Sequence, residues 1–481
     1  MNFEKKFDCF AKKIKKIGLS KNKLQDALEW GELYGRVLYT NYPDVYRDDE
    51  FENTLVAQYL AESEISSFTL PRKGDLHVVS EPYSTGGHTR LLEKIIKVRG
   101  SGDVLVTRPL SSTENVLNLS DLSEIRYSQT GFAINEILNI SSDYKTIFLH
   151  IHPDDLTSAV AMGVLKEKSS CRIIFINHAD HIFSFGYSSS SVVAEMGPFG
   201  DKLRKVKGRG EAVYLGLPFD LDEFKPVDCQ RLDGDLTIMS GATSFKYKTA
   251  AGLSFTKLVE DILGAIPNAK LIIIGPSISF EWRKVIMRYP TRLKVVPKLP
   301  YEEYRQLMED VDVYIDSFPL SGGTTVPEVR SKNIPVTGVL CGSYGYTPWD
   351  KTKYSSNTKL VSALKELGES DSSDIITRNN DKNLIAECNE VHSFSKFEER
   401  LKSITSGVNN TDMKFNHKVN YSYFNHFWKQ QEKLVLGKKS YLFLIKNWKS
   451  GGKEVMLLAM SINPLKYGMK LIGGYLKLLV R

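Results

Sequence analysis

The sequence contains no long hydrophobic segment and few cysteines. No apolar run in its 481 residues approaches the roughly 18–20 residues that a membrane-spanning helix needs. The five cysteines are scattered and form no Cys-x-x-Cys pair, which argues against a structural zinc site and for reduced thiols. The first residues, Met1 to Asp8, lack the apolar core of a secretory signal. We therefore expect a cytoplasmic protein.

A basic excess is also missing from most of the chain. The net charge is +7, but the segment from Lys438 to the end contains nine Lys or Arg residues and one acid, Glu454, so the rest is close to neutral. General nucleic-acid binding is therefore not expected. Residues 438–481 interleave these charges with Trp, Tyr, Leu and Ile, as interfacial helices on anionic lipid do. We expect this basic amphipathic tail to contact the inner face of a membrane; the alternative is a helix pair packed on the first domain.

Length and hydrophobic periodicity predict two α/β domains. A chain of 481 residues is too long for one hydrophobic core. Short apolar segments alternate with helix-length segments on both sides of an interruption near Leu215–Pro226, which indicates two doubly wound parallel sheets. The expected parts are a helical segment at 1–74, a Rossmann-like domain at 75–217, a linker at 218–234, a second Rossmann-like domain at 235–375, helices crossing back to the first domain at 376–437 and the tail at 438–481.

Eight of the apolar segments are short enough to be buried parallel strands. Helical periodicity separates several of them, as at Leu91–Val98 and Phe255–Leu263. The expected strands are His77–Ser80, Asp103–Arg108, Thr146–His150 and Arg172–Asn177 in the first domain, and Leu236–Met239, Lys270–Ile274, Leu293–Val296 and Val313–Ile315 in the second.

Polar side chains follow the expected strands of the first domain. They are the groups Gly86-Gly87-His88, His150-Ile151-His152 and Asn177-His178-Ala179-Asp180-His181. Ligands bind at the carboxyl ends of strands in such sheets, so we expect these groups at one edge. A neutral histidine oriented by a carboxylate suits a general base for a hydroxyl group, which makes His181, Asp180 and His178 candidate catalytic residues. We place this role before a divalent metal site or a purely structural role.

The stretch from Asp312 to Val336 is the most informative part of the second domain. A short apolar strand is followed by a turn with Gly322 and Gly323 and by a helix start, where Thr325 and Glu328 have capping-box spacing. Glycines let backbone N–H groups approach a ligand, and a helix N-terminus carries partial positive charge. The combination suits a diphosphate; the simpler interpretation is that the two side chains cap each other and the glycines only form the turn.

Two such domains, with a glycine-rich turn early in the first and this stretch late in the second, resemble the GT-B glycosyltransferases. Glu328 matches the second glutamate of the Glu-x7-Glu motif of retaining members, but Leu320 stands where the first belongs. The chain is more similar to the O-GlcNAc-transferase-like and GT4-like branches of bacterial surface-polysaccharide type. The resemblance implies tandem Rossmann-like domains with an interdomain cleft, a nucleotide-sugar donor, a UDP-sugar above all, no cofactor and no bound metal.

The resemblance assigns the donor site to the second domain. In the O-GlcNAc-transferase-like branch two threonines hold the donor diphosphate and an acidic residue binds the ribose, which implies these roles for Thr324, Thr325 and Glu328. A lysine after the first strand contacts the donor phosphates, where negative charge grows as the sugar leaves; Lys246 matches it, with Lys248 as the alternative. The other residues implied at the donor site are Ser240, Gly241, Leu299, Tyr304 and Gly323.

In the first domain the resemblance points to the glycine-rich turn. His88 would contact the acceptor, the donor phosphate or a transferred proton, although a turn-capping histidine would look the same. Gly86, Gly87 and Arg90 would lie on the acceptor side.

We therefore expect transfer of a hexosyl or N-acetylhexosaminyl group from a nucleotide sugar to a glycan or lipid-linked glycan. The alternatives are a protein glycosyltransferase, a catalytically silent nucleotide-sugar-binding subunit and a UDP-sugar epimerase. The sequence contains no helical repeat array of the kind that protein-modifying relatives often carry, which argues against a protein acceptor.

Overall fold

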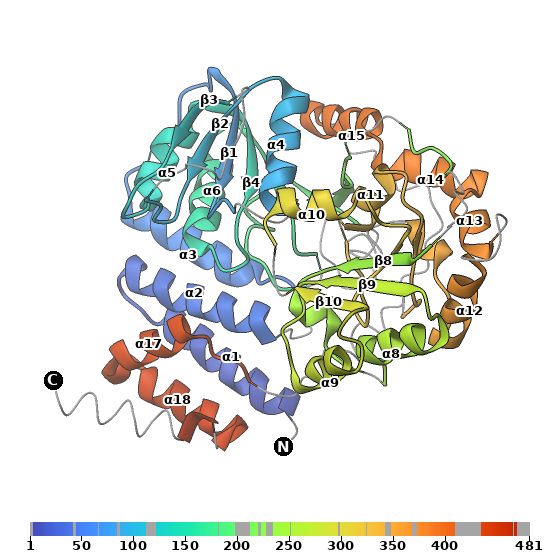
Figure 1. Cartoon of the computed structure of the whole chain (residues 1–481). Coiled ribbons are helices and arrows are strands. Elements are labelled where there is room, and N and C mark those ends of the chain that lie inside the picture. Colours follow the sequence, from blue (N-terminus) through green and yellow to red (C-terminus); the bar gives the residue numbers. More distant parts are fainter. Residues whose placement is uncertain are drawn as a thin grey trace. The chain divides into compact units, whose positions relative to one another are not determined.

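The chain divides into two compact units, shown in Figure 1 as a computed structural model. Unit 1 contains residues 1–195, 203–213 and 431–481, and unit 2 contains residues 196–202 and 214–430. The residues that the structure describes are 3–41, 45–65, 67–83, 87–111, 122–180, 182–197, 212–219, 223–227, 234–250, 252–296, 299–323, 325–341, 348–367, 373–408, 434–464 and 466–468.

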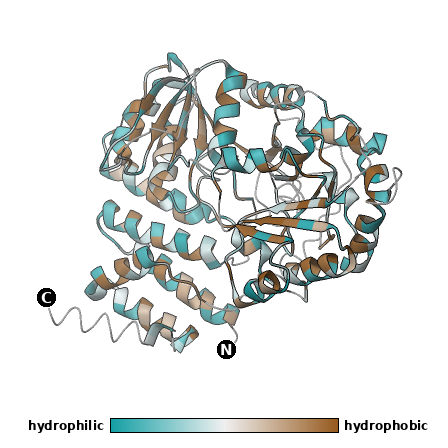
Figure 2. Ribbon diagram, in the orientation of Figure 1, coloured by the Kyte–Doolittle hydropathy of each residue, from teal (hydrophilic) through white to brown (hydrophobic). Residues whose placement is uncertain are grey.

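Unit 1 is built on a seven-stranded sheet in which the recorded pairings from β3 to β6 are parallel. Most residues of the central strands are buried, which explains why the strands are mainly hydrophobic in Figure 2. The strand order is β3 (Leu122–Arg126), β2 (Gly102–Val106), β1 (Lys73–Val79), β4 (Tyr144–His150), β5 (Arg172–Asn177), β6 (Val192–Glu195) and β7 (Ala212–Tyr214).

The four strands predicted for the first domain are confirmed, and three further strands were not predicted. β3 has the sequence Leu-Ser-Glu-Ile-Arg, in which polar residues interrupt the apolar ones. β6 and β7 have only four and three residues. Neither pattern gives the continuous apolar run by which the other strands are recognised.

Helices cover both faces of the sheet of unit 1 and form an additional layer with the two ends of the chain (Figure 1). α18 packs against α1, where Phe7, Phe10, Ile14 and Ile17 are buried at the helical spacing expected from the sequence. The helices are α1 (Phe3–Leu19), α2 (Leu24–Asn41), α3 (Asp49–Glu62), α4 (Gly87–Arg99), α5 (Ile134–Ser141), α6 (Leu156–Lys168), α17 (Lys438–Lys446) and α18 (Gly452–Ile462).

Close packing holds α2 over α6 and the loops beside it. A Cβ atom on Gly31 would lie 2.2 Å from Leu156 Cδ2, and one on Gly35 would lie 2.5 Å from the ring of Phe185. Only glycine allows this approach of α2. The approach brings Arg36 of α2 to Asp154, which precedes α6, and Glu32 to Thr157 in the first turn of α6.

The described part of the tail is a helix pair in the core of unit 1. Leu444 of α17 and Val455 of α18 are buried in the same hydrophobic cluster as α1 and α2. Polar contacts join the two ends of the chain as well, since Lys13 pairs with Glu454 and Lys6 Nζ donates to Ser461 O at 2.8 Å. For α17 and α18 the structure therefore shows the alternative given in the sequence analysis, a helix pair packed on the first domain.

Unit 2 is built on a five-stranded parallel sheet, and its four predicted strands are confirmed. The strand order is β10 (Leu293–Val296), β9 (Ala269–Ile274), β8 (Leu236–Gly241), β11 (Val313–Ile315) and β12 (Val336–Thr337). Its helices are α8 (Phe255–Ala265), α9 (Phe280–Arg288), α10 (Tyr301–Leu307), α11 (Thr325–Ser331), α12 (Asn357–Leu367), α13 (Asp374–Asn379), α14 (Lys382–His392) and α15 (Phe394–Ser406). In neither unit does a described helix have the length and hydropathy needed to cross a membrane.

The packing of the tail predicts a difference between two leucines of α17. Leu444 is fully buried and Leu442 is 52% exposed. Leu444→Ala should lower the free energy of unfolding of unit 1 by about 2–5 kcal/mol, because the helix pair loses core contacts. The matched variant Leu442→Ala should change it by less than about 0.5 kcal/mol. Urea titration of the full chain measures both, and equal effects would contradict the buried placement of α17.

Candidate functional site

A buried carboxylate organises the loop after β11 in unit 2. Asp316 Oδ1 accepts a hydrogen bond from Gly322 N at 2.8 Å, and its Oδ2 accepts one from Ser321 Oγ. A Cβ atom on Gly322 would lie 2.9 Å from Asp316 Oδ1, so the loop closes around the carboxylate only with glycine there. The carboxylate of Asp316 therefore fixes the conformation of the loop between β11 and α11.

Lys353 completes this buried group. Its Nζ lies 2.7 Å from Asp316 Oδ2 and 2.8 Å from Ser321 Oγ, and it also pairs with Asp350. Burial alone would lower the pKa of Lys353, but the carboxylates of Asp316 and Asp350 outweigh burial and raise it. The lysine is therefore charged, and removing one partner would leave an uncompensated buried charge.

Lys246 reaches the same loop from the turn after β8. It lies in a 3-10 helix (Ser244–Tyr247), and its Nζ donates to Ser321 O at 2.7 Å. Burial lowers the pKa of Lys246 to about 8, the carboxylate of Asp316 opposes this shift, and Lys353 adds to it. Two motifs that are 75 residues apart in the sequence thus meet at the carboxyl edge of one sheet.

The residues around Gly241 are packed rather than open. Gly241 N donates to Tyr314 OH at 3.0 Å, and Tyr314 OH donates to Gly241 O at 2.8 Å. The hydroxyls of Ser240 and Tyr247 are 2.9 Å apart. The ring of Tyr304 lies 3.0 Å from where a Cβ of Gly241 would stand. Gly241 therefore lets α10 approach the end of β8.

The other predicted donor residues of unit 2 differ in their exposure and in their packing. Thr325 begins α11, as expected from the sequence, and Glu328 follows one turn later; both are partly exposed. Gly323 lies in the turn before α11. Leu299 packs in the cluster that contains Tyr314. Lys248 is exposed, and Thr324 lies outside the described residues.

In unit 1, four histidines form a row at the carboxyl edge of the sheet. His77 Nδ1 lies 3.2 Å from His150 Nε2, and His150 Nδ1 lies 2.9 Å from His178 Nε2. The ring centroids of His88 and His178 are 4.1 Å apart, and His88 Nε2 lies 3.3 Å from His150 O. β1, β4, the residue that follows β5 and the start of α4 therefore contribute one imidazole each.

These four imidazoles are neutral. Burial is the main cause, and it lowers the pKa of His77 to about 3 and of His88 to about 4. Burial followed by the neighbouring imidazoles lowers the pKa of His150 well below its usual value, and burial followed by His88 does the same for His178. The row therefore offers N–H donors and lone pairs at neutral pH, not positive charge.

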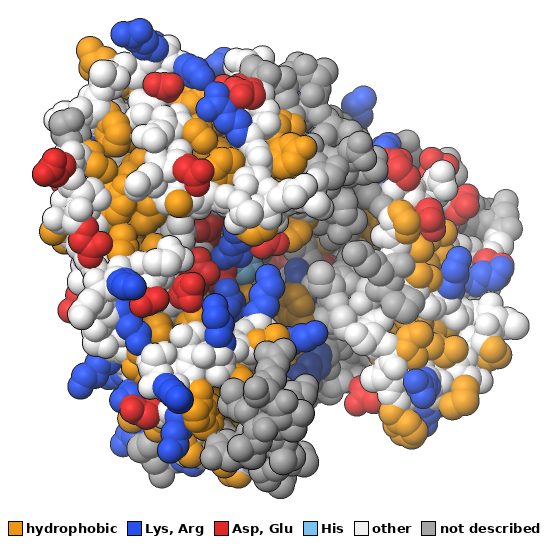
Figure 3. Space-filling model, turned by 90° about the vertical axis from the view of Figure 1, so that its left-hand side faces the viewer, with side chains coloured by type: hydrophobic (Ala, Val, Ile, Leu, Met, Phe, Trp, Pro, Cys, Tyr) orange, Lys and Arg blue, Asp and Glu red, His pale blue; other side chains and the backbone are white. Residues whose placement is uncertain are grey.

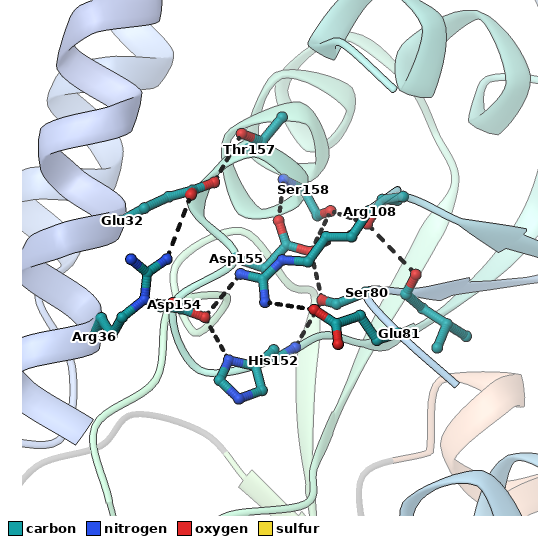
Figure 4. A network of polar contacts seen from close by, with 12 residues as sticks. Glu32, Arg36, Ser80, Glu81, Arg108, His152, Asp154, Asp155, Thr157 and Ser158 are labelled. Atoms are coloured by element: carbon teal, nitrogen blue, oxygen red, sulfur yellow. Dashed lines mark hydrogen bonds and ion pairs between the residues drawn. The ribbon is translucent and has the colours of Figure 1, made fainter. Parts of the chain in front are cut away.

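A second polar group lies at the same edge and is centred on Asp155 (Figure 4). Asp155 Oδ2 accepts hydrogen bonds from Thr107 Oγ1 at 3.1 Å, from Ser158 Oγ at 2.9 Å and from Ser80 Oγ. Its Oδ1 accepts one from Ser158 N at 3.0 Å, which caps α6. This carboxylate ties the ends of β1 and β2 to the start of α6.

The neighbouring Asp154 binds two guanidinium groups. Arg108 Nη2 lies 2.7 Å and Arg36 Nε 2.8 Å from its carboxylate, and His152 Nδ1 also contacts it. Burial alone would raise the pKa of Asp154, but His152, Arg108 and Arg36 together lower it. Figure 4 shows how the side chains converge from α2 and from the strand ends.

Glu32 of α2 lies at the border of this group, where Thr157 Oγ1 donates to its carboxylate at 3.4 Å. Burial and the negative charge of Asp155 raise the pKa of Glu32 to about 7, while Arg108 opposes the shift. Its carboxyl group is therefore partly protonated at neutral pH.

The structure brings two of the predicted catalytic residues together, His88 and His178. Asp180 is buried beyond the end of β5. On the predicted acceptor side, Gly87 begins α4 and Arg90 pairs with Glu93 at 2.6 Å. His181 and Gly86 lie outside the described residues.

Sequence reasoning did not identify several residues of these clusters, among them Lys353, Asp350, His77, Glu32, Asp154 and Asp155. Lys353 and Asp350 stand in a stretch without a recognisable pattern, so no signal marked them. His77 was predicted only as part of a strand. Residues two apart in a strand lie on the same face, so His77 could have been placed with Val79 on the face that packs against α4. Glu32 was part of a helical segment. Within the described ranges, no three or more His, Cys, Asp or Glu side chains are arranged to hold a metal ion.

The neutral histidines predict a pH-dependent stability of unit 1. Their pKa values are lower in the folded than in the unfolded chain, so below pH about 6.5 the unfolded chain binds more protons and stability falls. Glu32 and Glu52, whose pKa values are raised to about 7, oppose this trend down to pH about 4.5. The four histidines and two glutamates together give the unfolded chain two more bound protons than the folded chain. The free energy of unfolding therefore falls by about 3 kcal/mol for each pH unit below about 6.5.

Urea titrations at pH 7.5 and at 5.5 measure this loss. His77→Phe should reduce the slope by about 1.4 kcal/mol per pH unit, because one buried imidazole no longer has to be protonated in the unfolded chain. An unchanged slope in that variant would show that His77 is not held neutral.

No model of a known protein family matches the chain, and neither does any curated protein. Solved structures do match it. HepE of Anabaena in complex with UDP is 13% identical, with a TM-score of 0.50, and covers 70% of this chain and 100% of that chain. Sucrose-phosphate synthase of Thermosynechococcus elongatus is 14% identical, with a TM-score of 0.49 and coverages of 70% and 98%. An O-GlcNAc transferase of Thermobaculum terrenum is 14% identical, with a TM-score of 0.43 and coverages of 85% and 79%.

At these identities the likeness concerns the architecture of the chain. Unit 1 and unit 2 are each built on a parallel α/β sheet with helices packed against it. The chain therefore has the GT-B fold that the sequence led us to expect.

Proposed function

We propose that the chain is a glycosyltransferase that moves a sugar from a nucleotide sugar, specifically a UDP-sugar, to a glycan or lipid-linked glycan. The carrying observation is the contact between Lys246 Nζ and Ser321 O at 2.7 Å, which joins the two motifs of the expected donor site. The GT-B fold supports the proposal, and the solved HepE structure of this fold holds UDP.

On the donor side, Lys246 would supply positive charge to the diphosphate as the glycosidic bond breaks. The ammonium group sits on the loop whose shape Asp316 and Lys353 hold, so little reorganisation accompanies binding. Thr325 and the backbone of Gly323 would donate hydrogen bonds to the phosphate oxygens, and Glu328 would accept from the ribose hydroxyls. Thr324 would join them.

On the acceptor side, the carboxyl edge of unit 1 would receive a sugar hydroxyl. The neutral imidazoles of His88 and His178 suit an uncharged hydroxyl, and its proton would pass to His181 oriented by Asp180 or, failing that, to His88. Arg90, Gly86 and Gly87 would line this side. Sugar transfer would require only a base and a positioned hydroxyl on this side, because the nucleoside diphosphate of the donor is the leaving group.

We propose in addition that the chain lies on an anionic membrane surface. Residues 3–23 contain eight lysines and two acids, and residues 434–468 contain six lysines and one acid, which together give a net charge of +11 in a chain of +7. α1 and α18 pack side by side, so the two segments form one basic layer of unit 1. In Figure 3, Lys and Arg side chains are frequent in the lower part of the molecule, where Figure 1 shows α1, α17 and α18. Leu442 and Leu457 are exposed on it.

The donor site predicts the effect of removing Lys246. Lys246→Ala should weaken UDP binding by about 1.5–3 kcal/mol, the contribution of a charged hydrogen bond. Glu328→Ala should also weaken it, and Lys284→Ala, an exposed lysine of α9, should leave it unchanged. Isothermal titration calorimetry of the full chain measures all three. Unchanged affinity in both Lys246→Ala and Glu328→Ala would contradict the assignment.

The same preparation separates the proposed transferase from its alternatives. Transfer of radioactive sugar to a lipid-linked or free glycan supports the proposal, whereas labelling of a protein favours a protein glycosyltransferase. Conversion of the UDP-sugar without any acceptor favours an epimerase. UDP-sugar binding with neither reaction favours a silent subunit.

The basic layer predicts binding to anionic vesicles that weakens with salt, because surface charges are screened beyond ~8 Å at physiological ionic strength. Changing Lys16, Lys438 and Lys449 to Glu should lower the affinity at least about 100-fold, since each lysine contributes ~1 kcal/mol near such a surface. Deletion of the tail is unsuitable because it would expose the core of unit 1.

The matched control carries the same charge change on unit 2, at Lys284, Lys359 and Lys382. This control should bind vesicles of phosphatidylcholine with phosphatidylglycerol like the unmodified chain in a sedimentation assay. Equal loss of binding in both triple variants would mean that net charge, not the basic layer, drives the association.

A further inference from the structure

The row of histidines in unit 1 couples the protonation states of its members. Each of the two contacts, His77 to His150 and His150 to His178, needs one N–H and one lone pair. A neutral imidazole has one of each. Once one ring of the three is fixed, the other two are therefore fixed as well, and only two arrangements of the three protons are possible.

The surroundings of His77 Nε2 favour one of these arrangements. This nitrogen is buried, has no hydrogen-bond partner among the described residues and lies against Gly102, where a Cβ atom would be 3.1 Å away. In the first arrangement it carries a proton, and a buried N–H is left without an acceptor, which is rare in proteins. In the second it carries a lone pair, and each N–H within the row has a partner.

The second arrangement leaves the last proton of the row on His178 Nδ1. His77 Nδ1 then donates to His150 Nε2, and His150 Nδ1 donates to His178 Nε2. His178 follows β5 at the carboxyl edge of the sheet, and its side chain is not fully buried. The interior of unit 1 thereby decides which nitrogen of a surface imidazole is a donor.

His88 presents the opposite group beside it. Its Nε2 lies 3.3 Å from the carbonyl oxygen of His150, which can only accept, so Nε2 carries the proton. Nδ1 of His88 therefore has the lone pair, and this buried atom has no partner among the described residues. A donor on His178 and an acceptor on His88 thus belong to rings whose centroids are 4.1 Å apart.

We infer that His77 and His150 are positioning residues that fix the tautomer of His178, so that His178 and His88 together bind one uncharged hydroxyl group. The oxygen of the hydroxyl would accept from His178 Nδ1–H, and its proton would be donated to His88 Nδ1. An anion would find no positive charge in the row. The identity of that hydroxyl as the acceptor of a sugar rests on the proposed function, whereas the tautomers do not.

The tautomers are measurable by long-range proton–nitrogen NMR correlation of the full chain labelled with 15N-histidine. We expect His178 in a single form with the proton on Nδ1. His77→Phe removes the donor at the start of the row and should give a mixture of both forms. His77→Gln, whose amide can still donate to His150, should restore the single form. Phe148→Leu removes the ring stacked on His77 without changing a nitrogen and should leave the tautomer unchanged.

The ligand class is tested in the same spectra with glucose and with inorganic phosphate. Glucose should shift the resonances of His88 Nδ1 and His178 Nδ1 without adding a proton to either ring. The relay is overturned if His178 carries its proton on Nε2, or if His77→Phe keeps the single form. Phosphate binding that protonates either imidazole would overturn the hydroxyl assignment.

Kinetics separate this inference from the proposed function. If the chain transfers sugars, His77→Phe should lower kcat at least about tenfold, since a wrong histidine tautomer is costly in other enzymes. The KM for the nucleotide sugar should not change, because the donor is bound by unit 2. An active chain with unchanged kcat would contradict the role of the row in transfer. An inactive chain with the expected tautomers would count only against the transferase.

Discussion

One buried carboxylate holds the carboxyl edge of each sheet together. In unit 2 it is Asp316, which binds the backbone of Gly322 and the ammonium group of Lys353. In unit 1 it is Asp155, which binds hydroxyls from two strand ends and caps α6. A desolvated carboxylate is stable only when its oxygens are fully hydrogen-bonded, so these loops have little freedom. The groups proposed to contact a ligand depend on this support.

The two edges differ in charge, and the difference matches the two halves of a transfer reaction. The edge of unit 2 carries the ammonium group of Lys246, which suits a phosphate group, whereas the charge of Lys353 is paired with Asp316 and Asp350. The row of histidines in unit 1 is neutral, because burial holds the pKa values of His77 and His88 far below neutrality. Such a row offers directed hydrogen bonds to an uncharged group. Under the proposed function, the fold would separate recognition of an anion from recognition of a hydroxyl.

The fold was largely predictable from local patterns. Apolar runs such as Thr146–His150 and Lys270–Ile274 identified eight strands, since a strand buried on both faces must be apolar throughout. β3, β6 and β7 were not predicted, because their pairing is set by neighbours in the sheet rather than by their own residues. The packing of α17 and α18 on α1 was left open. A basic amphipathic helix has the same composition whether its apolar face meets lipid or protein.

The sequence by itself determined which residue types follow the strands: the glycine turn before Thr325, the lysine after β8 and the histidines near the ends of β1, β4 and β5. Tertiary structure decided which of them meet. Lys353 joins Asp316 from 37 residues away, and His77 joins His178 through His150. Parallel strands bring distant segments to one edge, and the register of their pairing fixes which side chains touch there. That register follows from the packing of whole sheets against helices, so no local pattern could have revealed it.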